Sequence, residues 1–186
     1  MFIVLEGIDG GGKSVQAEIL SKKYGWKLFK YPTRKFNEIN DFLEKKTSPD
    51  SRSLFLFFLA DIIEDQQNVR KELSAGKNVV MDRYCLSTIA YGFDYERGKE
   101  IVRLVEPLIP DKIILFDISI RGSMERKSRQ KTLDRYEEDV RWLENVGKNY
   151  LKLENERFLT PNWYKINADR PVETVSADIA RILRIP

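Results

Sequence analysis

A short motif near the N-terminus constrains the fold of this chain more than any other feature. Residues 7–14 read GIDGGGKS, a full match to G-x-x-x-x-G-K-[ST]. An apolar run, residues 2–5, precedes the motif, and a helix-like segment, residues 15–24, follows it. Glycines let the backbone wrap an anion with its N–H groups, and the helix dipole adds positive charge at the same point. The motif therefore predicts a phosphate-binding loop between a strand and a helix.

Four side chains outside the glycines indicate nucleotide chemistry. Lys13 would reach the β- and γ-phosphates, and the Ser14 hydroxyl would hold Mg²⁺, a hard cation that prefers oxygen ligands. Residues 79–82 are an apolar run ending in Asp82, the pattern of the second acidic element that acts on the magnesium shell. Alternatively, Asp82 would cap the next helix. Arg83 follows directly; its planar fork suits a phosphorylated acceptor and favours phosphate transfer over hydrolysis.

Apolar runs alternate with helical patterns along the chain. Five runs have the length and composition of strands: residues 2–6, 26–30, 78–82, 112–117 and 163–167. Helical patterns cover residues 13–24, 37–45, 51–74, 85–93, 99–106, 121–131, 133–158 and 171–183. Strands that recur after helices predict an α/β fold with a doubly wound, five-stranded parallel sheet and helices on both faces. Ligands bind such sheets beyond the carboxyl ends of the strands.

Composition excludes several classes of protein. The 186 residues include 32 basic and 29 acidic side chains, a net charge of +3, so the chain lacks the bulk positive charge of a non-specific nucleic-acid binder. Its longest apolar run, residues 54–60, is far shorter than the ~20 residues of a membrane span. A single cysteine, Cys85, allows no internal disulfide, and the N-terminus lacks a signal-peptide pattern. We expect one cytoplasmic domain, residues 1–186, that binds neither nucleic acid nor membranes.

Further short motifs, in order, extend the pattern of the phosphate loop. They are residues 5–14, Pro32 with Arg34, Phe58, residues 82–84 (DRY) and residues 134–137 (DRYE). With this order and spacing the chain resembles the thymidylate kinase family over nearly its whole length. The resemblance implies transfer of the ATP γ-phosphate to dTMP with Mg²⁺, giving dTDP and ADP. It also implies a P-loop NTPase fold with a helical lid at about residues 121–137, and a homodimer.

The resemblance assigns an acceptor site residue by residue. Asp9 would orient the acceptor phosphate and the metal, with Asp82 as its partner. Arg34 and Arg83 would grip the monophosphate.

The same matching assigns the nucleoside part of the acceptor. Phe58 would stack on the pyrimidine ring, and Thr88 would stand near the base edge. Tyr91 matches a tyrosine that crowds the sugar 2′ position and so favours deoxyribose. The alternative for Tyr91 is an ordinary core aromatic residue one turn along a helix.

The lid is expected to supply a catalytic arginine. In this family that arginine comes from the phosphate loop or from the lid, and Gly10 and Gly11 occupy the loop positions here. An arginine supplied at closure is worth ~10³ to 10⁵ in rate. We expect Arg126 in this role, with Arg129 as second choice. A solvated basic helix face is the alternative for each of them.

The donor nucleotide is expected to contact the phosphate loop, the lid and the loop after the last strand. Arg135 would lie over the adenine or the phosphates, and Ala168 belongs to the adenine-side loop, residues 166–170. A plain turn explains that loop equally well, because Asn167 stands where the family usually has aspartate. The full set of donor-binding residues is Gly7, Gly10, Gly11, Gly12, Lys13, Ser14, Val15, Arg135 and Ala168.

One position departs from the family pattern. Four residues after Phe58 the family usually carries an arginine that contacts the thymine carbonyl, and this chain has Ile62. Loss of one hydrogen-bonding side chain at the base lowers the discrimination between bases by ~1–3 kcal/mol. Either a neighbour such as Arg70 or Arg52 substitutes, or the pocket accepts another pyrimidine monophosphate such as dUMP. We predict weaker base discrimination than is usual in the family.

Two alternatives of another kind stay open at this point. A non-catalytic, nucleotide-dependent switch would share the phosphate loop, although the chain lacks an Asn-Lys-x-Asp motif for reading guanine. A degenerate family member could bind nucleotide without turnover. Cys85, next to the DRY motif, is expected to be a small buried hydrophobic residue and not a nucleophile.

Overall fold

The computed structural model describes the backbone of residues 1–130 and 140–186 and the side chains of residues 1–128 and 140–186. Five parallel strands form one sheet in the order β2-β3-β1-β4-β5. Their bounds are β1 Phe2–Glu6, β2 Lys27–Lys30, β3 Val79–Asp82, β4 Lys112–Asp117 and β5 Trp163–Asn167. The chain moves to one side of β1 for β2 and β3, and to the other side for β4 and β5. The phosphate loop follows β1, at this switch point, where α/β sheets bind ligands.

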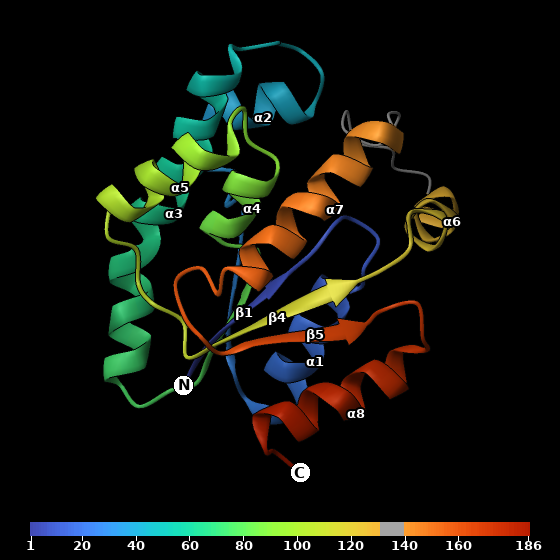
Figure 1. Ribbon diagram of the computed structural model, residues 1–186. Coiled ribbons are helices and arrows are strands. Elements are labelled where there is room, and N and C mark those ends of the chain that lie inside the picture. The colour runs from blue at the N-terminus through green and yellow to red at the C-terminus, as the bar shows by residue number, and fades with distance from the viewer. Residues whose placement is uncertain (131–139) are drawn as a thin grey trace.

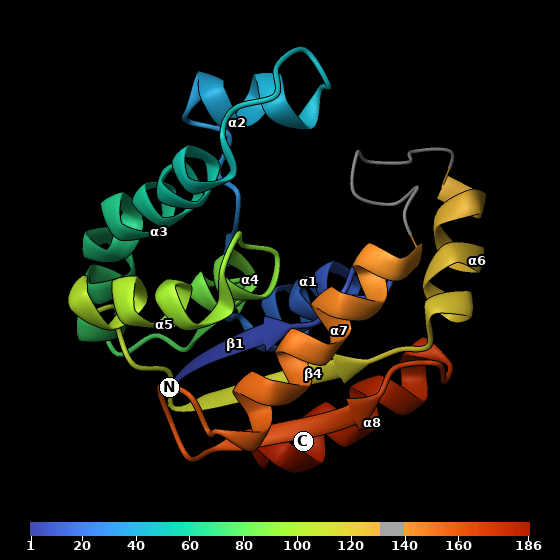
Figure 2. The ribbon, with the colours of Figure 1, turned by 45° about the horizontal axis from the view of Figure 1, so that its top comes forward.

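Helices cover both faces of the sheet (Figures 1 and 2). One face carries α1 (Lys13–Tyr24) and α8 (Val172–Leu183), which contact each other. The other face carries four helices: α3 (Ser51–Ser74), α4 (Cys85–Ala90), α5 (Tyr95–Leu104) and α7 (Val140–Asn155). Two more, α2 (Asn37–Leu43) and α6 (Ile120–Gln130), extend outward, and α6 stands beyond the carboxyl end of β4. The predicted fold class is therefore confirmed.

The central strands form the floor of the core. Every residue of β1 and β3 is buried, as expected for central parallel strands that are covered on both faces. The register places Leu5 of β1 opposite Asp82 of β3. This pairing brings the end of β3 beside the start of the phosphate loop. Cys85 is fully buried at the start of α4, as expected.

Helix α3 buries one face within this chain. Leu54, Phe55 and Leu59 are buried, whereas the side chain of Leu56 is 54% exposed. A helix turns about 100° per residue, so a continuous apolar run necessarily reaches the outward face as well. Within the described part of the chain, no helix is long and apolar enough to cross a membrane.

Helix bounds differ from the prediction at several ends. Helix α5 begins at Tyr95 and not at residue 99, because the Asp94 carboxylate caps it by accepting from the Arg97 amide at 3.1 Å. Gly98 lies inside this helix, where a Cβ would come 3.2 Å from the Phe55 ring. Helices α2 and α4 end earlier than predicted, at Leu43 and Ala90. The predicted helix start at residue 133 lies outside the described residues.

Candidate active site

The phosphate loop has the backbone geometry that its glycines predict. Gly10 and Gly12 adopt φ angles of 75° and 89°, in the left-handed region that favours glycine. A Cβ at Gly10 would come 2.8 Å from the backbone oxygen of Ser123, so α6 packs directly on the loop. Lys13 is almost fully buried, and its Nζ donates to the Ile8 carbonyl at 2.8 Å. Burial, reinforced by the nearby Arg83 charge, lowers the pKa of Lys13 to about 8.

The two expected metal ligands meet at the start of α1. The Ser14 hydroxyl donates to Oδ2 of Asp82 at 2.5 Å. Lys30, which the sequence did not single out, places its Nζ 3.2 Å from Ser14 Oγ and 3.7 Å from Asp82 Oδ2. A hydroxyl and a carboxylate are hard oxygen ligands, so this pair fits Mg²⁺. Among the described residues no group of three or more His, Cys, Asp or Glu could hold a metal. Nucleotide phosphates and water would therefore complete the shell.

Asp9 is surrounded by cations. Its carboxylate pairs with Nη2 of Arg83, accepts from the Tyr91 hydroxyl at 3.2 Å and lies 3.7 Å from Nζ of Lys127. Burial alone would raise the pKa of Asp9, but the charges of Arg83, Lys13 and Lys127 outweigh it and hold the pKa well below its usual range. Arg83 adopts φ 71°, a strained backbone of the kind found at functional sites. The anionic Asp9 thus holds Arg83 and Lys127 in place, and both cations suit a phosphate.

Glu6 anchors a buried hydrogen-bond network behind this cluster, and the sequence analysis gave it no role. The side chain is fully buried; Oε1 accepts from the amides of Tyr84 (2.8 Å) and Ser87 (3.2 Å). Oε2 accepts from the hydroxyls of Ser87 (2.6 Å) and Tyr150 (3.0 Å). Burial raises the pKa of Glu6, against the lowering effect of the Ser87 hydrogen bond and the Arg83 charge. One feature of the sequence does mark Glu6: it is a carboxylate at the end of an otherwise apolar strand.

That network also positions Arg83. Nη1 of Arg83 donates to the Ser87 hydroxyl at 3.1 Å and to the Tyr150 hydroxyl at 3.4 Å. Tyr150 belongs to α7, so the helix that follows the lid segment is tied to the end of β1. The fork of Arg83 is therefore held from Nη1 by neutral groups and from Nη2 by Asp9.

The expected acceptor residues come from separate elements. Arg34 is exposed on the β2–α2 loop at φ 68°, and its carbonyl accepts from Asn40 Nδ2 at 2.9 Å. The fully buried Asp61 of α3 holds that loop through the Thr33 amide, at 2.7 Å, and the Thr33 hydroxyl. Phe58 is half-buried on α3, edge-on to a second phenylalanine, Phe42, at 6.5 Å.

The remaining acceptor positions lie on α3 and just beyond α4. Thr88 is buried in α4, and Tyr91, directly after it, contacts both Asp9 and Arg83. Ile62 is only 2% exposed and belongs to the core. Of its suggested substitutes, Arg52 pairs with Asp50 at 3.5 Å at the start of α3. Arg70 is exposed nearer the other end of that helix.

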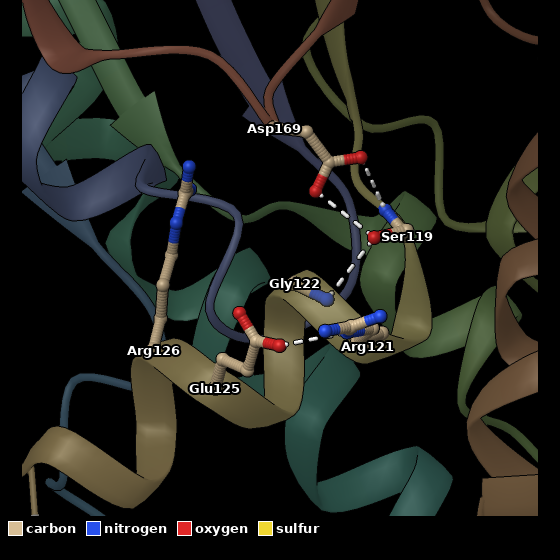
Figure 3. A pocket seen from close by; sticks show the side chains of 6 residues that line it. All are labelled: Ser119, Arg121, Gly122, Glu125, Arg126 and Asp169. Atoms are coloured by element: carbon tan, nitrogen blue, oxygen red, sulfur yellow. Dashed lines mark hydrogen bonds and ion pairs between the residues drawn. The ribbon is translucent and has the colours of Figure 1, made fainter.

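A cavity of about 340 Å³ opens between the start of α6 and the β5–α8 loop (Figure 3). Asp169 joins its two walls, since its carboxylate accepts from the Ser119 amide and hydroxyl, each at 3.0 Å. Ser119 in turn accepts from the Gly122 amide at 3.0 Å and caps the helix. The lining residues are Ser119, Arg121, Gly122, Glu125, Arg126 and Asp169.

Arg126 joins the phosphate loop to the β5–α8 loop. Its guanidinium donates to the carbonyls of Gly10 (3.2 Å), Ala168 (2.7 Å) and Arg170 (3.3 Å). These bonds place the Ala168 carbonyl near that of Gly10 in the phosphate loop, and the adenine-side role of Ala168 stays a prediction. They also direct Arg126 at backbone oxygens, so its expected role at the transferred phosphate stays a prediction. The side chains of Arg129 and Arg135 lie outside the described residues, as do the other residues of the DRYE motif.

The strand, glycine loop and helix, together with an arginine that faces the loop, define a class of protein. It is a P-loop nucleotide phosphotransferase of the nucleoside monophosphate kinase type. Residues 5–179 match the family model described as thymidylate kinase. The chain belongs to the thymidylate kinase family.

Individual relatives match most of the chain. A "Probable thymidylate kinase" of Methanocaldococcus jannaschii is 37% identical over 84% of this chain and 82% of that protein. A second, from Thermococcus kodakarensis, is 33% identical over 98% of this chain and 97% of its own. A solved thymidylate kinase of Candida albicans superposes with a TM-score of 0.81 at 25% identity, covering 98% and 90% of the two chains.

Proposed function

We propose that this chain transfers the γ-phosphate of ATP to dTMP in the presence of Mg²⁺, giving dTDP and ADP. The observation that carries the proposal is the meeting of the phosphate loop with Arg83 at Asp9. A loop lysine and an acceptor-side arginine stand around one carboxylate, which is the arrangement that two juxtaposed phosphates need. Membership of the family supports dTMP as the acceptor.

The transfer proceeds in line and without a covalent enzyme intermediate. An oxygen of the acceptor monophosphate attacks the γ-phosphorus, while the bond from that phosphorus to the β–γ bridging oxygen breaks. The sequence contains no histidine, and this chemistry needs mainly positioning and charge neutralisation. Lys13 binds the β- and γ-phosphates of the donor, and Arg83 with Arg34 binds the acceptor phosphate. Arg83 exchanges its pairing with Asp9 for phosphate oxygens as the acceptor enters.

The Ser14 hydroxyl and the Asp82 carboxylate would hold the magnesium ion. When bound, Mg²⁺ would neutralise charge on the phosphates. Lys30 sets the local charge, since its ammonium lies within 3.7 Å of Asp82. Asp9 remains ionised at neutral pH because the cations around it lower its pKa.

The donor and acceptor nucleosides take opposite sides of the loop. The adenine side of ATP uses the cavity between α6 and the β5–α8 loop, next to Ala168. The acceptor base stacks on Phe58, with Thr88 near its edge and Tyr91 against the sugar. The lid comprises residues 121–137 of a single domain, residues 1–186; its part beyond residue 130 lies outside the described backbone.

The chain acts as a cytoplasmic homodimer that pairs through the outer face of α3. Leu56, which is 54% exposed, lies on the unburied side of this helix. A twofold contact would cover the same apolar side chains on both copies. Sedimentation at micromolar concentration should give a dimer, and Leu56→Glu should shift it toward monomer. A wild-type protein that sediments only as monomer would overturn this part of the proposal.

A coupled ADP-release assay tests the activity. Mg-ATP is supplied with dTMP, and Lys13→Ala serves as the blank because it removes the cation that binds the donor phosphates. The proposal predicts dTMP-dependent ADP release that the blank lacks. ADP release that does not depend on any nucleoside monophosphate would contradict it.

A further inference from the structure

Helix α6 presents a second cation to the reaction site, next in sequence to Arg126. Lys127 is only 9% exposed at its side chain, and its Nζ lies 3.7 Å from Oδ2 of Asp9 in the phosphate loop. We propose that Lys127, and not Arg126, is the α6 residue that stabilises the transferring phosphoryl group. The assignment rests on the proposed phosphate transfer.

The directions of neighbouring α6 side chains separate their roles. Successive residues point about 100° apart around a helix. Arg126 therefore meets the carbonyls of Gly10, Ala168 and Arg170, whereas Lys127 meets the carboxylate of Asp9. Arg121, one to two turns earlier, is 89% exposed and pairs with Glu125 on its own helix.

Arg126 is committed to backbone oxygens by three hydrogen bonds. If Arg126 moved to a phosphate, the carbonyls of the phosphate loop and of the β5–α8 loop would lose their charged donor. This loss would destabilise the contact between the two loops. At Asp9, Lys127 exchanges a carboxylate oxygen for a phosphate oxygen, which carries charge of the same sign. The lysine is therefore the side chain of this pair that can meet the developing charge without loosening the loops.

The phosphate loop itself creates the need for this charge. Gly10 and Gly11 provide no side-chain cation. The transition state spreads charge over the equatorial oxygens of the transferred group. Lys13 and Arg83 approach Asp9 from the loop and from the end of β3, and Lys127 approaches from α6. An ammonium as buried as that of Lys127 acts more strongly than one on the surface.

Helix α6 is also fixed to the loop at the point where Lys127 acts. The Ser123 hydroxyl, one turn before Lys127, donates to the carbonyl of Asp9 at 2.7 Å. The backbone of Ser123 packs against Gly10 so closely that no Cβ fits there. These two contacts of Ser123 hold α6 against the loop one turn before Lys127.

The test compares Lys127→Met and Lys127→Arg with Lys22→Met. Lys22 is a matched control, because its side chain is 78% exposed on α1 and pairs with Glu18 on its own helix. For each variant we would measure kcat and KM with dTMP and Mg-ATP, and the Kd for ATP by calorimetry. Lys127→Met should lower kcat by about 10²-fold or more while the Kd for ATP changes by less than about 3-fold. Lys127→Arg should recover a large part of kcat.

Each other outcome overturns the assignment in a distinct way. If the kcat of Lys127→Met lies within about 3-fold of an active wild type, the role of Lys127 is rejected and the proposed phosphate transfer is not. A Kd for ATP that worsens in step with kcat assigns Lys127 a structural role at the loop. If Lys127→Met does not fold, Lys127→Gln replaces it. A wild-type protein without dTMP-dependent turnover would reject the proposed function, and this assignment with it.

Discussion

The hydroxyl of Ser14 donates to Oδ2 of Asp82 at 2.5 Å, although the two residues are 68 positions apart in sequence. The contact follows from the register in which Leu5 faces Asp82, since β1 leads into the loop that carries Ser14. Two hard oxygen atoms are thereby brought together, which is the arrangement that the proposed magnesium-dependent transfer needs.

Loss of either oxygen should weaken the use of magnesium. Ser14→Ala and Asp82→Asn are each expected to raise the Mg²⁺ concentration for half-maximal turnover by about 10- to 100-fold. Magnesium titrations at fixed ATP measure the change. Ser74→Ala, at the exposed far end of α3, is the control. Unchanged titrations in both site variants would remove these residues from the metal site.

The buried Lys13 should impose a pH dependence on donor binding. Its pKa is lowered to about 8, chiefly by burial, so the free enzyme loses this positive charge as the pH rises past that value. We therefore expect kcat/KM for ATP to fall above pH 8, because a neutral amine attracts phosphate weakly and kcat/KM reports the free enzyme. The profile of kcat should bend at higher pH, since bound phosphates favour the charged amine. A kcat/KM that stays flat from pH 7 to pH 10 would contradict this assignment.

The hydroxyl of Tyr150 should contribute to stability. It donates to the buried carboxylate of Glu6 at 3.0 Å and lies 2.8 Å from the Ser87 hydroxyl. Tyr150→Phe should lower the free energy of unfolding by about 1–3 kcal/mol, because these buried polar groups lose a partner. Urea denaturation measures the change. Tyr24→Phe, whose hydroxyl bonds to an exposed carbonyl, should stay within about 0.5 kcal/mol. Equal effects of both variants would show that the Glu6 network adds no stability.

Base selection by this chain should be weaker than is usual in the family. Ile62 is buried in the core and offers the base no hydrogen bond. Values of kcat/KM for dTMP, dUMP, dCMP and dGMP measure the discrimination. We expect dTMP to be preferred by less than about 10³-fold, since one polar readout is missing. A larger preference would mean that another side chain reads the thymine edge.

Local sequence patterns predicted much of the fold and of the chemistry of the phosphate loop. The strands β1, β4 and β5 and the helices α1 and α3 have the predicted bounds. The phosphate-loop motif sets the start of α1 and Gly25, at φ 70°, ends it, whereas Asp50 caps the start of α3. Lys13, Ser14, Asp82 and Arg83 were recognisable because each belongs to a short motif. The doubly wound sheet then brings such motifs to one edge.

Contacts that depend on long-range packing were beyond the reach of those patterns. Tyr150 meets Glu6 across 144 residues, and no local motif marks either partner. The choice between Arg126 and Lys127 depends on how α6 is rotated against the loop, which composition cannot show. Helix α5 begins at Tyr95, earlier than predicted, and Gly98 inside it makes room for the Phe55 ring.

The central claim is the transfer of phosphate from ATP to dTMP. The most direct measurement supplies ATP labelled at its γ-phosphate together with Mg²⁺ and dTMP, and separates the products by chromatography. The account predicts label in dTDP with the wild-type protein and none with Lys13→Ala. Label released as inorganic phosphate, or retained in ATP while the protein binds nucleotide tightly, would contradict it.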